Sequence, residues 1–159
     1  MKHARLIALG MLVATCFAIG QGPVPASTPP ETPALSAVPR FQALDVFVDS
    51  GAKPLAAWQV HVHATGGSVK IVGVEGGEGV YANAPYYDLK AIQRERVVIG
   101  GLSTLSGEQL PTGKVRVARV HVMIEGNGDA TFAAELETAG DGAAKRIDAK
   151  ASVVVMERK

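Results

Sequence analysis

Cysteine is almost absent from this chain: Cys16 is the single cysteine among 159 residues. One cysteine cannot form a disulfide within the chain. If Cys16 is removed with the N-terminal segment described below, the remaining chain has no thiol and no thiolate metal site is possible. Stability must then come from an ordinary hydrophobic core, which a composition of 47% hydrophobic residues can supply.

A strong charge of either sign is also missing. The chain has 16 basic and 15 acidic residues, and no run of five or more Lys or Arg occurs. Removing Lys2 and Arg5 leaves 14 basic residues against 15 acidic ones, a net charge near −1. Nucleic acids and anionic membrane surfaces attract proteins through clustered positive charge. We therefore expect neither as a partner.

The sequence lacks the motifs that commonly mark an active site: G-x-S-x-G, H-E-x-x-H, C-x-x-C and the P-loop pattern do not occur. Residues 77–82 (GEGVYA) match G-x-G-x-x-A after an apolar run. A dinucleotide site needs a helix at that point, and the Ala84-Pro85 pair that follows disfavours one. We therefore predict a protein that is not an enzyme and has no cofactor.

Residues 1–20 have the pattern of a secretory signal peptide. Lys2 and Arg5 form a short positive region, residues 6–17 are almost entirely apolar, and a small-residue Ala-Ile-Gly sequence ends the segment. The apolar run is too short to cross a bilayer comfortably. We expect cleavage before Gln21, and a secreted or cell-envelope protein with no membrane span.

Cys16 offers an alternative to secretion. It lies near the end of the apolar run, where the lipid-bearing cysteine of a lipoprotein would lie. The preceding residues, LVAT, are a poor match, because the residue before such a cysteine is normally Gly or Ala. Lipidation at Cys16 would anchor the protein to a membrane.

Residues 21–39 form a predicted linker. Six of the nine prolines in the chain fall between residues 22 and 39, with Ser, Thr and Ala among them. Such a segment has little to bury and favours an extended or polyproline conformation. We expect it to separate the N-terminal segment from a folded domain at 40–157.

From residue 40 onward the sequence has the pattern of short β-strands. The clearest alternation is at 58–65, where Trp58, Val60 and Val62 alternate with more polar residues. Turn residues recur about every 8–12 residues, and no helical periodicity extends over three turns. At least seven such strands predict an all-β fold, an antiparallel β-sandwich with Trp58 in its core.

Four segments resemble, in the same order, the strands of the cohesin domain, within the wider carbohydrate-binding-like sandwich group. They are 55–63 (LAAWQVHVH), 71–78 (IVGVEGGE), 95–99 (ERVVI) and 113–122 (GKVRVARVHV). The resemblance covers residues 44–155 and implies an immunoglobulin-like or jelly-roll antiparallel β-sandwich of the cohesin type. Cohesins of cellulosomes bind dockerin modules. The resemblance therefore implies a non-catalytic binding module with a protein partner, either dockerin-like or from the cell envelope.

The resemblance also implies a binding surface on a sheet face. Strand alternation places three side chains on the solvent side of one strand and three on that of another. In cohesin-like folds these two strands are expected as neighbours in the smaller sheet, so that all six side chains would form one exposed patch for the protein partner. The six residues are Gln59, His61, His63, Arg119, His121 and Met123.

Three members of this predicted patch are histidines: His61, His63 and His121. Imidazole nitrogens suit Zn²⁺ or Cu²⁺, so these residues are candidate metal ligands. A polar, solvent-facing sheet surface that happens to use histidine would have the same pattern. The sequence by itself does not decide between the two interpretations.

The stretch 79–93 is long for a loop and contains every tyrosine of the chain: Tyr81, Tyr86 and Tyr87. A helical turn is expected after Pro85. Sugar-binding modules stack apolar sugar faces on exposed aromatic rings, so a carbohydrate-binding module that recognises a polysaccharide through these tyrosines is the alternative function. The other interpretation is that the tyrosines pack the loop onto the sandwich.

Overall fold

The computed structural model describes residues 38–105 and 107–156, most of which lie in eight β-strands. The predicted signal peptide, Cys16 and most of the predicted linker fall outside the described residues. The strands are β1 (Arg40–Asp49), β2 (Ala57–Gly66), β3 (Ser68–Gly76), β4 (Tyr86–Tyr87), β5 (Arg96–Leu102), β6 (Lys114–Glu125), β7 (Thr131–Gly140) and β8 (Lys150–Met156).

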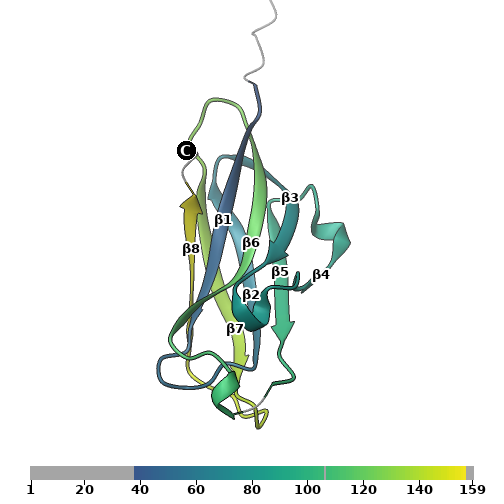
Figure 1. Cartoon of the computed structure of the whole chain (residues 1–159). Helices are drawn as coiled ribbons and strands as arrows, with labels where there is room; N and C mark the ends of the chain where they lie inside the picture. Colours follow the sequence, from purple (N-terminus) through teal and green to yellow (C-terminus); the bar gives the residue numbers. More distant parts are fainter. Residues whose placement is uncertain (1–37, 106, 157–159) are drawn as a thin grey trace, which may run out of the picture. The chain divides into compact units, whose positions relative to one another are not determined.

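The strands form two four-stranded sheets, which Figure 1 shows as two layers. One sheet has the order β3-β6-β1-β8 and the other has the order β4-β5-β2-β7. Every pairing between neighbouring strands is antiparallel. The prediction of an all-β antiparallel sandwich is confirmed, while its cohesin type stays a prediction. Among the described residues no helix is long and apolar enough to span a membrane.

The hydrophobic core lies between the inner faces of the two sheets, as strand alternation requires. Trp58, Val60 and Val62 of β2 are buried, and Trp58 is only 3% exposed, which confirms its predicted place in the core. From the other sheet, β1 contributes Leu44 and Val46 to the same core cluster. Side chains at the intervening positions of β2 therefore point outward, and these positions carry the candidate residues Gln59, His61 and His63.

The first and last strands have clear boundaries. Residues 40–42 belong to β1 and pair with β6 as far as Ile124. β8 begins at Lys150, and in the connection that precedes it the backbone N–H of Ile147 donates to the carbonyl oxygen of Ala139 (3.0 Å).

The predicted loop at 79–93 contains the short turn η1 (Gly79–Tyr81), strand β4 and the turn η2 (Leu89–Ala91). β4 pairs with β5 opposite Gly100 and Ile99, so this segment adds an edge strand to the sheet. The turn expected after Pro85 is the 3₁₀ turn η2. A further turn, η3 (Gly107–Gln109), precedes β6.

Candidate functional site

The six residues predicted to form one patch are divided between the two sheets. Gln59, His61 and His63 belong to β2, whereas β6 lies in the other sheet. The inner faces of both sheets form the core, so the outward side chains of β2 and β6 lie on opposite sides of the sandwich. The expectation that these strands are neighbours is therefore wrong. We call the outer surface of the β4-β5-β2-β7 sheet the β2 face and that of the β3-β6-β1-β8 sheet the β6 face.

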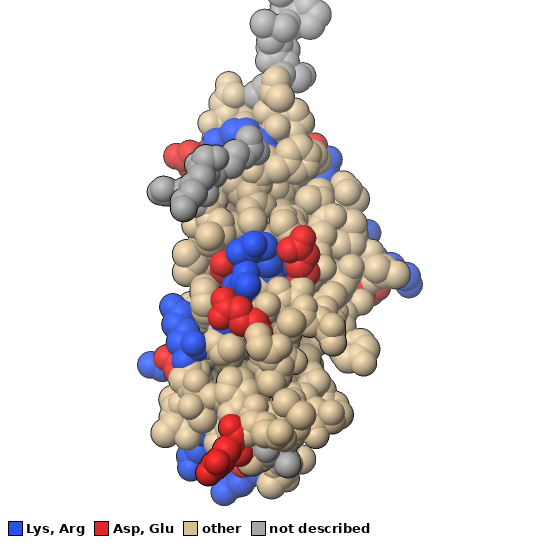
Figure 2. Space-filling model, in the orientation of Figure 1, with Lys and Arg blue, Asp and Glu red and all other residues tan. Residues whose placement is uncertain are grey.

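On the β6 face, the candidate residues already have partners within the chain. The Arg119 guanidinium donates from Nε to Asp45 Oδ1 (2.7 Å) and from Nη2 to Asp45 Oδ2 (3.0 Å). Arg116 donates from Nη1 to the same Oδ1 (3.2 Å), and His121 Nε2 lies 3.0 Å from Glu75 Oε1. Figure 2 shows basic side chains between acidic ones over β1 and β6.

Asp45 is the centre of this ionic cluster and is 6% exposed. Burial alone would raise the pKa of its carboxyl group, but the hydrogen bond from Arg119, followed by that from Arg116, holds the pKa below its usual value of 3.8. The pKa of Arg119 is raised in turn by the hydrogen bond to Asp45. The cluster is thus a structural element that ties β1 to β6.

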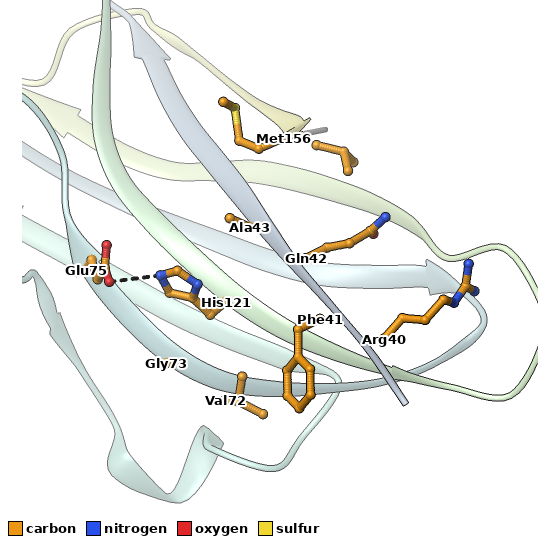
Figure 3. Close-up of a pocket in the computed structure, with 10 residues that line it drawn as sticks. Arg40, Phe41, Gln42, Ala43, Val72, Gly73, Glu75, His121 and Met156 are labelled. Carbon is orange, nitrogen blue, oxygen red and sulfur yellow. Dashed lines mark ion pairs between the residues drawn. The ribbon is translucent and has the colours of Figure 1, made fainter. Parts of the chain in front are cut away.

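A groove of about 880 Å³ also lies on the β6 face and is shown in Figure 3. Of the six predicted partner-binding residues, His121 alone lines it, at the end where Glu75 lies. Apolar side chains such as Phe41 and Met156 form much of the rest. Arg119 and Met123 do not line this groove.

A second groove, of about 660 Å³, lies on the β2 face. It is lined by two of the predicted protein-binding residues, Gln59 and His61, together with two of the predicted sugar-binding residues, Tyr86 and Tyr87. The strand register explains this meeting: Tyr86 pairs with Gly100 of β5, and Gly100 pairs with Gln59 of β2. The two predicted functions therefore share one surface.

The floor of the β2-face groove is low because Gly100 has no side chain between Tyr86 and Gln59. Tyr86 is 82% exposed at one side of it. On the other side, Gln59 Nε2 donates a hydrogen bond to a carboxylate oxygen of Glu137. A shift of register in the β2–β7 pairing, between Gln59 and Val60, brings Glu137 to this position. The groove combines an exposed aromatic ring with polar side chains.

The three tyrosines have different environments. Tyr81 is 4% exposed, its hydroxyl donates to the carbonyl oxygen of Leu55 (2.6 Å), and its ring lies edge-on to Trp58. Burial raises the pKa of Tyr81 to about 12. The interpretation that the loop tyrosines pack onto the sandwich is confirmed for Tyr81, and the alternative role of Tyr81 in stacking on a sugar is wrong, because its ring belongs to the core. Tyr87 is half-buried against the core, which leaves Tyr86 as the exposed ring.

The β2 face also brings His61 and His63 close to Glu135 of β7. The two imidazole ring centroids lie 5.0 Å apart, and Nε2 of His63 lies 3.9 Å from Oε1 of Glu135. One ligand atom from each of these three residues lies within 4.8 Å of the others. His121 is on the opposite side of the sandwich, so the predicted histidine trio does not assemble.

Glu135 is the residue that sequence reasoning missed. The alternation along 131–136 places its side chain outward, but nothing in the sequence indicates that β7 pairs with β2.

Comparisons with known protein families, with curated proteins and with solved structures found no match to this chain.

Proposed function

We propose that this chain is an exported, non-catalytic binding module that recognises a protein partner through its β2 face. The observation that carries the proposal is the groove in which Gln59 and His61 of β2 meet the exposed Tyr86 of β4. Export is supported by the signal-peptide pattern of residues 1–20. The cohesin resemblance supports a sheet face as the recognition surface.

The carboxylates of the groove support binding more than catalysis. Glu137 accepts a hydrogen bond from Gln59, and Asp88 accepts one from the backbone N–H of Lys90 at the start of η2. Both carboxylates thus stabilise the shape of the surface, whereas acid–base chemistry needs a carboxyl group positioned to exchange a proton with a substrate. A pre-formed surface of this kind suits recognition with little backbone movement.

Tyr86 is the expected energetic centre of the interface. Tyrosine and arginine are enriched among residues that dominate binding energy, and Arg96 lines the same groove. An apolar side chain of the partner would lie over Gly100 against the Tyr86 ring. A sheet patch four strands wide and about seven residues long measures roughly 19 by 23 Å, or about 440 Å². A standard interface uses about 800 Å² per partner, so a protein partner must cover the whole β2 face and contact residues beyond its edges.

Polysaccharide binding is the second candidate function, and the 82% exposure of Tyr86 is the observation that favours it. One exposed ring offers one stacking platform, and Gln59 and Glu137 offer hydrogen bonds to sugar hydroxyls. The burial of Tyr81 and the partial burial of Tyr87 remove the extended row of rings that a longer sugar chain would use. For this reason the protein partner is the preferred proposal.

The test is a binding series on a partner identified by cross-linking from the envelope and secretome of the producing cell. Tyr86→Ala and His61→Ser should each weaken binding about tenfold or more, since a dominant interface residue contributes about 2 kcal/mol. Phe41→Ala is the matched control, because it removes an exposed aromatic ring from the β6 face. Binding that is lost in Phe41→Ala but kept in Tyr86→Ala would overturn the proposal. Tyr86-dependent binding to polysaccharide in affinity electrophoresis would favour the second candidate.

A further inference from the structure

The β2 face also holds a side-chain set that shares only His61 with the groove of the proposed function. We propose that His61, His63 and Glu135 bind a divalent transition-metal ion of the Zn²⁺ or Cu²⁺ class. The proposal concerns the metal alone and needs no partner protein. It differs from the three-histidine site expected from the sequence, because Glu135 takes the place of His121.

The geometry of the sheet brings the three side chains together. His61 and His63 are two residues apart on one strand, so both imidazoles point to the same side. Glu135 pairs directly with His61 in the β2–β7 register, and its carboxylate reaches within 3.9 Å of the His63 ring. The ligands therefore come from two adjacent strands whose hydrogen-bonded ladder holds their backbones in place.

The distances are close to those that an ion needs. Zinc lies about 2.0–2.2 Å from nitrogen and oxygen ligands, so two ligand atoms of a tetrahedral site are about 3.4 Å apart. The three ligand atoms here lie within 4.8 Å of one another, so closure needs movements of about an ångström. Glu135 can make such a movement, because its side chain is 68% exposed, whereas the His63 side chain is 23% exposed and more constrained.

The ring nitrogens of His63 are not committed to strong contacts. Its Nδ1 is buried and has no hydrogen-bond partner among the described residues. Its Nε2 is 3.9 Å from Glu135, which is longer than a hydrogen bond. His121 lies 3.0 Å from a carboxylate oxygen of Glu75 through its Nε2, but it differs from His63 because no second imidazole lies beside it in the described part of the chain. The pair formed by His121 and Glu75 therefore serves as a control for the proposed metal site.

The ligand types select the class of ion. Two imidazoles and one carboxylate suit Zn²⁺, Cu²⁺ or Ni²⁺, while Ca²⁺ and Mg²⁺ prefer oxygen ligands alone. Three protein ligands leave at least one coordination position open to water or to a donor from another molecule. Arg96 pairs with His63 from β5, and its positive charge opposes a bound cation. The site is therefore expected to bind more tightly when that charge is removed.

The experiment is a titration of the full chain with Zn²⁺ by calorimetry, after removal of metals with a chelator. It uses a background of His3→Gln and Cys16→Ser, because both residues can bind Zn²⁺ and both lie outside the described residues. We expect one Zn²⁺ per chain and no competition from Ca²⁺. His61→Gln and Glu135→Gln should each weaken binding about tenfold or more, as loss of a ligand does at least as much damage as loss of a supporting residue. Arg96→Gln should strengthen binding severalfold.

His121→Gln is the matched control and should change the Zn²⁺ affinity by less than about twofold, since His121 lies in the other sheet, away from the proposed ligands. In NMR spectra, Zn²⁺ should shift the ring signals of His61 and His63 and leave those of His121 unchanged. The Glu135 side chain is exposed, so Glu135→Gln should keep the fold, which circular dichroism checks. Unchanged affinity in both His61→Gln and Glu135→Gln, or a shift of the His121 signals alone, would overturn the proposal. Loss of partner binding in Tyr86→Ala bears on the proposed function and leaves this result untouched.

Discussion

Gly101 of β5 lies against the indole ring of Trp58, and we expect that no larger residue fits at this position. β2 and β5 are neighbours, and Trp58 pairs with Gly101 in register. A methyl group on residue 101 would lie 2.7 Å from the ring atoms Cε2, Cζ2 and Nε1. Carbon atoms in contact are normally about 3.5–4.0 Å apart, so Gly101→Ala forces either the ring or the strand to move.

The ring has little freedom to move. Trp58 is 3% exposed, and its indole lies edge-on to Tyr81 with ring centroids 5.9 Å apart. Tyr81 is held in turn by its hydrogen bond to Leu55. Overpacking a core costs about 1–3 kcal/mol. Alanine in a strand is favoured over glycine by about 0.5–1 kcal/mol, which offsets part of that cost. We therefore expect Gly101→Ala to destabilise the domain by about 1–2 kcal/mol.

Urea denaturation followed by far-ultraviolet circular dichroism measures this effect in a double-mutant cycle. Trp58→Leu destabilises the domain on its own but leaves room for the methyl group of residue 101. In the Trp58→Leu background, Gly101→Ala should be neutral or stabilising, for a coupling energy of about 1–3 kcal/mol. Gly100→Ala is the matched control, because its added methyl group would meet only the Trp58 carbonyl oxygen at 3.4 Å.

Equal stability of Gly101→Ala and Gly100→Ala would refute this reasoning, as would an equal cost of Gly101→Ala in both backgrounds. Either result would mean that the indole does not cover residue 101 and that the β2–β5 register is different. A different β2–β5 register would also change the lining of the groove, because the present register places Gln59 beside Gly100 and Tyr86.

Two further predictions concern other parts of the chain. Asp45→Asn should lower the free energy of unfolding at pH 7 by about 1–3 kcal/mol, because Arg116 and Arg119 lose their shared carboxylate. Since the folded-state pKa of Asp45 lies below 3.8, the stabilisation is fully present above that pH and is lost as the pH falls through the lower folded-state value. The gap in stability between parent and variant should thus narrow as the pH falls below 3.8, and a gap that stays constant would exclude ionisation as its source. The intact mass of the exported protein should correspond to a chain that begins at Gln21, whereas a start at Cys16 with added acyl mass would indicate a lipoprotein.

Local sequence pattern determined the fold class and the direction of individual side chains. Trp58, Val60 and Val62 were predicted to face the core from their alternation alone, and all three are buried. The same alternation placed Gln59 and His61 outward. A period of two residues is a property of one strand, so a short window of sequence is enough to read it.

The tertiary structure decided which outward side chains meet. His61 and His121 are both outward, yet they lie on opposite sides of the sandwich because β2 and β6 belong to different sheets. Glu135 meets His63 because β7 pairs with β2 across a separation of about seventy residues. Strand pairing depends on such distant contacts, and alternation within a strand carries no information about them.

The tyrosines illustrate the same division. The sequence places all three in one stretch with nothing to distinguish them as binding or packing residues. Tyr81 enters the core because η1 places its ring beside Trp58 and its hydroxyl beside Leu55. Tyr86 stays exposed because its side chain points to the outer side of the sheet, whereas that of Tyr87 points to the core. Whether each ring is buried or exposed depends on residues that are distant in the chain and close in space. The residues next to each tyrosine in the sequence do not reveal these contacts.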